Sequence, residues 1–310
     1  MKLHMNMKGI SKGKAQTYDS ELENDPASLA PTRLFVNWQR RNREGIGYDL
    51  CYSFAGSDYN PKMGYEQREN FTRVGNRVLY GWLPDEPSKL YQHRFFVEGF
   101  TCFQNENGAV QSAAIGPGWM GQTRNFYYLE LAYKRYAEQV DEAFELSNDI
   151  EIPEGYYTFH GLEATFETPG QHAVYTFGKI QAGQFYDGHG LMMTLGPQWN
   201  IVNDFELSAE YIYNWITFPR RDCIFLSHII RLRALATLSL KFSILAFVQY
   251  NNAADVLVSN VRLRYNPREG NDFYLVYDEG TYTERHRYVP VRPRTGNRTI
   301  LFKYSYAFLF

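Results

Sequence analysis

The stretch Ile300-Leu-Phe-Lys-Tyr-Ser-Tyr-Ala-Phe-Leu-Phe310 decides the fold. Successive side chains of a β-strand point to opposite faces, so every second residue of this stretch shares a face. One face is apolar and aromatic over its whole length: Ile300, Phe302, Tyr304, Tyr306, Phe308 and Phe310. The other face carries Lys303 and Ser305 among small and aliphatic residues. An aromatic face that continues to the last residue favours a strand that lies in lipid.

The same stretch resembles the closing strand of Gram-negative outer-membrane β-barrels. In those proteins a final strand that ends in Phe is also the signal read by the barrel-insertion machinery. The resemblance implies an insertion signal made by Tyr304, Tyr306, Phe308 and Phe310, with the lipid bilayer and that machinery as partners. We therefore expect an all-β protein, an antiparallel transmembrane β-barrel in the outer membrane of a Gram-negative bacterium.

The composition agrees with a barrel. The 310 residues include 25 Tyr, 22 Phe and 5 Trp, yet the mean hydropathy is -0.46. A barrel alternates lipid-facing and lumen-facing residues and so averages to a polar score, whereas membrane helices form continuous apolar blocks. The net charge of -2 gives no reason to expect nucleic-acid binding, which needs a surplus of Lys and Arg. Three widely spaced cysteines predict neither a disulfide framework nor a metal site.

Two features of the sequence bear on membrane helices and on export. The best candidate for a helical span, 225–250, carries Arg231, Arg233 and Lys241, and each charge near a helix centre costs about 2.5 to 3.5 kcal/mol. The first residues contain no apolar run of signal-peptide length. Because an outer-membrane protein must be exported, we expect residues 1–310 to form one barrel domain at the C-terminal end of a longer protein.

Alternation with a period of two recurs along the chain. In 205–215, for example, Glu206 and Glu210 share a face opposite Tyr211 and Trp215. The pattern predicts about 16 strands, at 2–12, 32–40, 46–56, 70–83, 90–104, 109–119, 123–136, 155–167, 172–184, 190–200, 204–217, 224–238, 240–251, 256–266, 272–279 and 298–310. The longer polar stretches 17–31, 139–153 and 280–297 are expected to be loops.

Charged residues on these strands predict a polar lumen. Arg231 and Arg233 share one face, as do Arg262 and Arg264, and aliphatic residues fill the opposite faces. A basic residue in lipid at mid-membrane costs about 2 to 4 kcal/mol, so these side chains should point inward. The lumen-lining candidates are Arg231, Arg233, Arg262, Arg264, Glu206, Glu210, Lys241 and Lys303. They form either a basic strip that selects anionic solutes or a network of Arg, Glu and Tyr that fills and stiffens the barrel.

Several short motifs resemble a bacterial family known as domain of unknown function 5916. The turn 59–65 is similar to its Phe-Asn-Pro-Glu-x-Gly-Phe element through Tyr59, Asn60, Pro61, Gly64 and Tyr65, with Lys62 in place of the Glu. Further similar elements follow in order at 152–157, 248–251, 260–265, 272–277 and 303–306. In this family a carbohydrate-binding domain, similar to family-9 modules, precedes the barrel. The resemblance implies a carbohydrate- or surface-binding partner domain that is absent here.

Three functions are compatible with these features: a pore for small polar or anionic solutes, a structural barrel that anchors a partner domain, and an outer-membrane hydrolase. For the hydrolase, the seven histidines form no HExxH motif, and no G-x-S-x-G elbow is present. The G-x-G-x-x-G pattern at 116–121 precedes a strand-like segment rather than a helix, which disfavours a nucleotide site. The sequence predicts no cofactor and no metal. A soluble β-sandwich or jelly roll is the rival fold.

Aromatic residues at the ends of the strands favour a membrane interface, where a ring has one wet edge and one apolar face. The candidates are Tyr48, Trp82, Trp199, Trp215 and Tyr304.

Overall fold

The protein is built from antiparallel β-strands. The computed structural model describes residues 29–61, 68–147, 150–202, 204–287 and 289–307. The strands are β1 (Arg33–Arg40), β2 (Gly45–Ala55), β3 (Phe71–Trp82), β4 (Leu90–Gln104), β5 (Val110–Thr123), β6 (Tyr128–Val140), β7 (Phe144–Ser147), β8 (Ile150–Ile152), β9 (Gly155–Glu167), β10 (Val174–Phe185), β11 (Gly188–Val202), β12 (Phe205–Phe218), β13 (Cys223–Ser239), β14 (Phe242–Asn251), β15 (Val256–Arg268), β16 (Asn271–Tyr282) and β17 (Thr295–Tyr306). A 3-10 helix, η1, covers Arg285–Arg287. No helix among the described residues is long and apolar enough to cross a bilayer.

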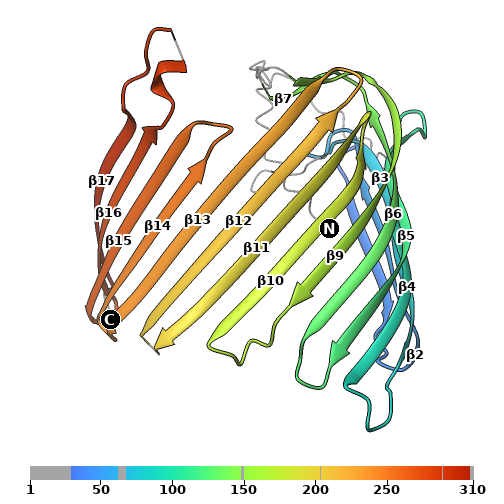
Figure 1. Ribbon diagram of the computed structural model, residues 1–310, viewed down its shortest axis with the longest axis horizontal. Helices are drawn as coiled ribbons and strands as arrows, with labels where there is room; N and C mark the ends of the chain where they lie inside the picture. Colours follow the sequence, from blue (N-terminus) through green and yellow to red (C-terminus); the bar gives the residue numbers. More distant parts are fainter. Residues whose placement is uncertain (1–28, 62–67, 148–149, 203, 288, 308–310) are drawn as a thin grey trace.

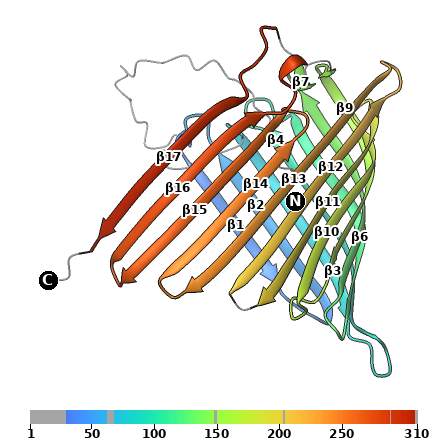
Figure 2. The same ribbon diagram turned by 60° about the vertical axis from the view of Figure 1, so that its left-hand side comes forward.

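Fifteen strands form one continuous sheet in which each strand pairs with its neighbours in the chain, except that β6 pairs with β9. The intervening β7 and β8 form a separate two-stranded hairpin. The large sheet curls strongly, so that Figures 1 and 2 show an open barrel of inclined strands. Within the described residues its two edges, β1 and β17, have no partner on their outer sides.

The expected all-β antiparallel architecture is confirmed, and fifteen of the sixteen predicted segments correspond to strands of the large sheet. The sixteenth, 2–12, lies outside the described residues. The expected loop 139–153 is wrong in part, because it contains β7 and β8. The predicted strand 123–136 begins too early, because 124–127 form the turn into β6, and β16 and β17 extend into the predicted loop 280–297.

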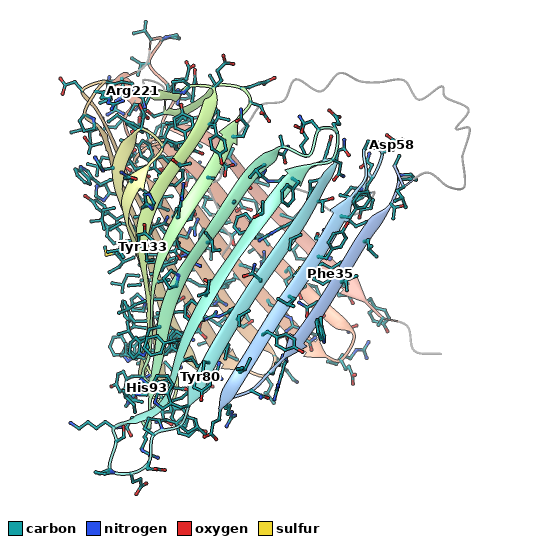
Figure 3. The ribbon with its side chains drawn as sticks, turned by 90° about the vertical axis from the view of Figure 1, so that its right-hand side faces the viewer. Phe35, Asp58, Tyr80, His93, Tyr133 and Arg221 are labelled. Carbon is teal, nitrogen blue, oxygen red and sulfur yellow. The ribbon has the colours of Figure 1, made fainter. Side chains whose placement is uncertain are left out.

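The two ends of the sheet differ. At one end the connections are tight: β13 ends at Ser239 and β14 begins at Phe242, and β15 ends at Arg268 and β16 begins at Asn271. At the other end lie the longer connections 56–70, 141–154 and 283–294. Tyr306, the last residue of β17, pairs with Asn271 at the tight-turn end. Figure 3 shows Tyr80 and His93 near the tight-turn end and Asp58 and Arg221 near the long-loop end.

The register divides the side chains of the large sheet between two faces. Glu210, Arg231 and Gln249 are directly opposite one another on β12, β13 and β14 and therefore share one face. The adjacent row, which includes Tyr211 and Ile230, lies on the opposite face. On the first face, Arg77 of β3 reaches Glu130 of β6 across two intervening strands, because the curl of the sheet brings the side chains of this face together. We call this concave side the inner face and the convex side the outer face.

Burial is strongly unequal between the two faces. The buried side chains of the large sheet, such as Phe96, Met120, Phe185, Ile216 and Phe218, lie on the inner face by register. The hairpin β7–β8 packs onto this face at the long-loop end through Ile150 and Ile152, forming the largest buried cluster. Outer-face aliphatic and aromatic side chains are mostly exposed.

Two glycines create the space for inner-face rings. A Cβ atom on Gly118 of β5 would lie 2.2 Å from the Cζ atom of Phe96, and a Cβ atom on Gly196 of β11 would lie 2.1 Å from the Cε1 atom of Phe177. Each glycine therefore accepts the ring of the neighbouring strand against its bare backbone. Both of these rings lie on the inner face.

Candidate functional site

The charged residues of the large sheet collect on the inner face. By register, the ionised side chains on the outer face of its described strands are confined to Arg40, Arg135, Arg268, Glu279 and Arg298. The outer face instead presents exposed apolar side chains, from Ile46 on β2 to Ile300 on β17, which is 69% exposed. Soluble proteins have the reverse arrangement, with apolar residues buried and charges in water.

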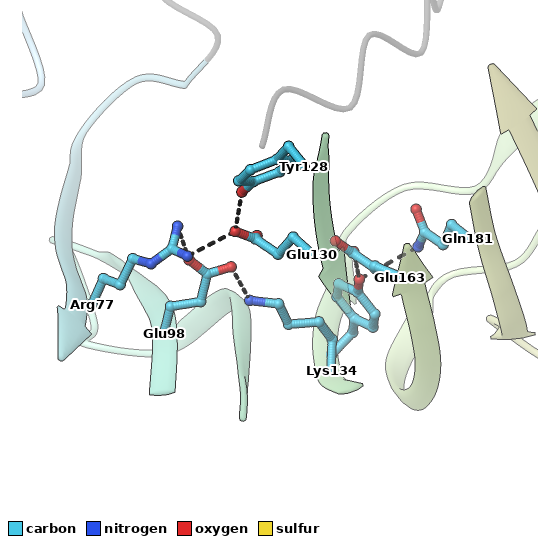
Figure 4. Close-up of polar contacts among 8 residues, drawn as sticks. Arg77, Glu98, Tyr128, Glu130, Lys134, Glu163 and Gln181 are labelled. Carbon is cyan, nitrogen blue, oxygen red and sulfur yellow. Dashed lines mark hydrogen bonds and ion pairs between the residues drawn. The ribbon is translucent and has the colours of Figure 1, made fainter. Parts of the chain in front are cut away.

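A network of four charged side chains and one tyrosine crosses the inner face from β3 to β6, as Figure 4 shows. The Arg77 guanidinium lies 3.4 Å from the Glu98 carboxylate and 2.8 Å from that of Glu130. The Lys134 ammonium lies 2.5 Å from Glu98, and the Tyr128 hydroxyl donates to Glu130 at 2.6 Å. Lys134 is only 5% exposed. A buried ammonium requires a partner, and Glu98 supplies it.

The polar network continues onto the next strands. The Tyr136 hydroxyl on β6 donates to the Glu163 carboxylate on β9, and the Gln181 side chain on β10 donates to Tyr136 at 3.4 Å. The Arg77 guanidinium also lies 4.0 Å from the centre of the Phe96 ring, a cation–π contact. The inner face between β3 and β10 is thus held by hydrogen bonds and ion pairs that span several strands.

The structure places the arginines predicted to line the lumen on the inner face and pairs three of them. Arg231 lies 3.1 Å from Glu210, and Arg233 lies 3.2 Å from Glu206. Arg264 lies 2.8 Å from Asp272. Their positive charge is therefore balanced by carboxylates on neighbouring strands, which is the arrangement of a stiffening network.

The remaining lumen-lining candidates are less constrained. Arg262 shares the inner face through its register partners Leu245 and Val276 and is exposed, and the described residues give it no ion pair. Lys303 on β17 lies opposite Tyr274 on the same face. Lys241 lies in the turn before β14, outside the strands.

Part of the predicted insertion signal and part of the family motif are described. Tyr304 and Tyr306 lie on the outer face of β17 and are exposed, whereas Phe308 and Phe310 lie outside the described residues. In the motif, the ring of Tyr59 packs beside the buried cluster of Ala55, Phe71 and Cys102. Asn60 and Pro61 follow it in irregular structure, and Gly64 and Tyr65 lie outside the described residues.

Aromatic side chains gather on the outer face near the tight-turn end. Trp82 stacks on His93 at 4.9 Å and on Phe95 at 5.5 Å, and the Trp119 indole N–H donates to His93 at 3.3 Å. Two further predicted interface residues, Tyr48 and Trp199, also lie on the outer face by register. His93 could not be recognised as part of this cluster from the sequence, because its position next to Trp82 depends on the pairing of β3 with β4.

Two other outer-face histidines, His160 and His228, also contact aromatic residues. The Tyr133 hydroxyl lies 2.6 Å from the Nδ1 atom of His160, and the Tyr211 hydroxyl lies 2.7 Å from that of His228. In the described part of the chain, no three His, Cys, Asp or Glu residues are grouped so as to hold a metal ion. The G-x-G-x-x-G pattern at 116–121 lies within β5, where no helix follows it.

A tyrosine at the long-loop end is partly buried in the turn between β10 and β11. Tyr186 packs against Phe185 at 4.9 Å and Tyr157 at 5.1 Å. Burial, with additional contributions from the negative charge of Glu138 and from Tyr157, raises the pKa of Tyr186 to about 12. The phenol therefore stays neutral at pH values at which an exposed tyrosine ionises.

No protein-family model, curated protein or solved structure matches the chain. The resemblance to domain of unknown function 5916 therefore stays a prediction.

Proposed function

We propose that this chain is an integral β-barrel of the outer membrane, with a polar interior through which small polar solutes pass. The observation that carries the proposal is the segregation of charge onto the inner face of the sheet. An exposed apolar surface on this scale is stable against hydrocarbon but not in water. The same segregation argues against a β-sandwich, whose apolar faces would pack against each other.

The dimensions of the strands support a membrane location. Among the strands of the sheet, β11 has 15 residues and β16 has 12. At a rise of ~3.3 Å per residue and a tilt of ~40°, such strands span roughly 30 to 38 Å, enough for an apolar band of about 25 Å. The Trp82, His93 and Trp119 cluster is the type of aromatic border found at such an interface.

The two ends of the sheet support an orientation. Bacterial barrels have short turns on the periplasmic side and longer loops on the cell surface. By this rule the tight-turn end, where β17 ends at Tyr306, faces the periplasm. The hairpin β7–β8 and the connection 283–294 then face outward.

The ion pairs of the inner face favour a pore with weak charge selectivity rather than one for anions. Arg231 and Arg233 carry their own counter-charges in Glu210 and Glu206. We expect the protein to insert into planar bilayers and to conduct K⁺ and Cl⁻ with similar permeability. Replacing both arginines with Gln leaves the two carboxylates unbalanced and should shift the reversal potential toward cation selectivity.

The double variant Glu206→Gln/Glu210→Gln is the matched control, because it leaves the two arginines unbalanced instead. It should shift the reversal potential in the opposite direction, toward anion selectivity. Absence of conductance in the inserted wild-type protein would exclude the pore. Absence of insertion would exclude the barrel itself. Insertion can be followed by the heat-dependent shift of the folded protein on gels and by protection from protease in vesicles.

A second candidate function, a barrel that anchors or assembles with a partner, is favoured by the two unpaired edges. Because consecutive strands alternate in direction and the sheet has an odd number of them, β1 and β17 run the same way. One further antiparallel strand between them would complete the hydrogen bonding of both edges, as in strand addition to an exposed edge. A barrel completed by a stably co-purifying protein, with no conductance, would support this function over the pore.

A further inference from the structure

A shallow apolar groove lies on the outer face over β6, β9 and β10. Six of its lining side chains form a regular grid: Leu131, Ala164 and Ile180 are opposite one another in one row, and Tyr133, Leu162 and Ala182 in the next. The groove has a volume of about 380 Å³. It exists because Ala164 and Ala182 are small, whereas Leu162 between the two alanines projects outward and is 63% exposed.

A row of polar side chains borders the groove on the side of the long-loop end. Arg135 is directly opposite His160, Gln184 on β10 accepts the backbone N–H of His160 at 3.2 Å, and His189 is directly opposite Gln184. All four are exposed on the outer face. The Tyr133 hydroxyl, which hydrogen-bonds His160 at 2.6 Å, joins this row to the groove. Figure 3 shows Tyr133 on the outer side of the sheet.

Arg135 differs from the other charged residues of the outer face. Arg298 lies 2.5 Å from Glu279, Arg268 at the end of β15 donates to the Tyr306 hydroxyl at 3.1 Å, and Arg40 is the last residue of β1. Arg135 lies within β6, and the described residues give it no ion pair. A guanidinium on a lipid-facing surface is unfavourable near the bilayer centre and less so toward the interface, so a counter-ion at this position would be stabilising.

We propose that this surface binds an anionic glycerophospholipid, with an acyl chain in the groove and the phosphate at Arg135. The inference rests on the membrane location proposed above. The guanidinium presents several N–H donors suited to a phosphate, and Gln184 and the histidines add hydrogen-bonding groups beside it. The apolar side chains of the groove can pack against methylene groups. The small side chains of Ala164 and Ala182 leave a hollow that a straight acyl chain can fill.

Retention of defined lipids by the detergent-purified protein tests the proposal. The protein is incubated with mixed micelles of phosphatidylglycerol or of phosphatidylcholine, and bound lipid is counted by native mass spectrometry. Wild type should retain phosphatidylglycerol in preference to phosphatidylcholine. Arg135→Gln should weaken phosphatidylglycerol retention about tenfold, the loss expected for one charge-assisted phosphate contact. Ala164→Phe, which fills the groove, should weaken retention of both lipids.

Arg40→Gln is the matched control, because it removes an outer-face arginine away from the groove and should leave retention unchanged. Equal retention of both lipids by wild type, or unchanged retention by Arg135→Gln, would overturn the site. Each variant is also assayed for the heat-dependent gel shift and for insertion into vesicles. A variant that inserts normally but loses the lipid isolates the site, whereas a wild-type protein that does not insert overturns the membrane proposal instead.

Discussion

The Arg77 guanidinium on β3 and the Glu130 carboxylate on β6 form an ion pair at 2.8 Å across two intervening strands. The contact is possible because the sheet curls and the side chains of its inner face converge. Arg77 also contacts Glu98, and Glu98 pairs with the nearly buried Lys134, so the four side chains form one network. The most stringent mutational tests of the fold therefore lie on this face.

Removing the carboxylate of Glu98 should destabilise the protein. Glu98→Gln leaves the Lys134 ammonium buried without its counter-charge, and loss of one partner of a buried ion pair costs about 3 to 5 kcal/mol. Urea unfolding in detergent measures the change. Lys303→Gln is the control, because Lys303 lies on the exposed end of the same face. The double variant Glu98→Gln/Lys134→Met should recover much of the lost stability. If the changes in unfolding free energy of the two single variants simply add in the double variant, the coupling between Glu98 and Lys134 is contradicted.

A charge introduced on the outer face should be costly, and the same charge on the inner face should not. Leu232 and Leu235 lie on opposite faces of β13, and Leu235 is directly opposite Glu206. Leu232→Lys should cost about 2 to 4 kcal/mol in a bilayer, with little change for Leu235→Lys. Unfolding in lipid vesicles provides the measurement. In a soluble sheet the exposed Leu232 would tolerate Lys, so an unaffected Leu232→Lys protein would contradict the membrane proposal.

A methyl group at Gly118 should disturb the inner face. The added Cβ atom would lie 2.2 Å from the Phe96 ring, and that ring supports the Arg77 guanidinium. We expect Gly118→Ala to lower the free energy of unfolding by about 1 to 3 kcal/mol through overpacking. Gly170→Ala is a suitable control because no atom lies within 4 Å of its added Cβ. Equal unfolding midpoints for the two variants would refute the close packing.

Alkaline pH should destabilise the long-loop end through Tyr186. Its folded-state pKa of about 12 is above the value of ~10 for an exposed tyrosine, so the folded protein holds the proton more tightly. The stabilisation is present below pH ~10 and is lost as the pH rises through 10 toward 12. Tyr186→Phe should flatten this part of the stability profile, and Tyr127→Phe should leave it unchanged. If Tyr186→Phe leaves the dependence of stability on pH unchanged, the loss of stability at alkaline pH does not arise from Tyr186.

Much of the strand pattern could be predicted because alternation is a local property. The segment 205–215 alternates between Glu206, Ser208 and Glu210 on one face and apolar residues on the other, which indicates a strand whatever its partners. The hairpin β7–β8 was not predicted because its strands have only 4 and 3 residues. Segments this short contain too few residues for a strand with a period of two to be distinguished from a polar loop.

The contacts of the inner face could not be predicted in the same way. Alternation assigns Arg77 and Glu130 each to a face of its own strand, but their meeting requires both the pairing order and the curl of the sheet. For Arg231 and Arg233, the shared face followed from their spacing, whereas their neutralisation by Glu210 and Glu206 required the register of β12 against β13. The polar row of Arg135, His160 and Gln184 depends on three strands and has no local signature.

The hairpin β7–β8 makes the two mouths of the barrel unequal. Ile150 and Ile152 rest against Phe218 and its buried neighbours on the inner side of the rim, so the hairpin narrows the entrance at the long-loop end. In the pore proposed above, a solute from that end meets the hairpin before it reaches the ion-paired interior, whereas one from the tight-turn end reaches the ion pairs first. Current through an inserted molecule should consequently depend on the sign of the applied voltage, and deletion of the hairpin should make it symmetric.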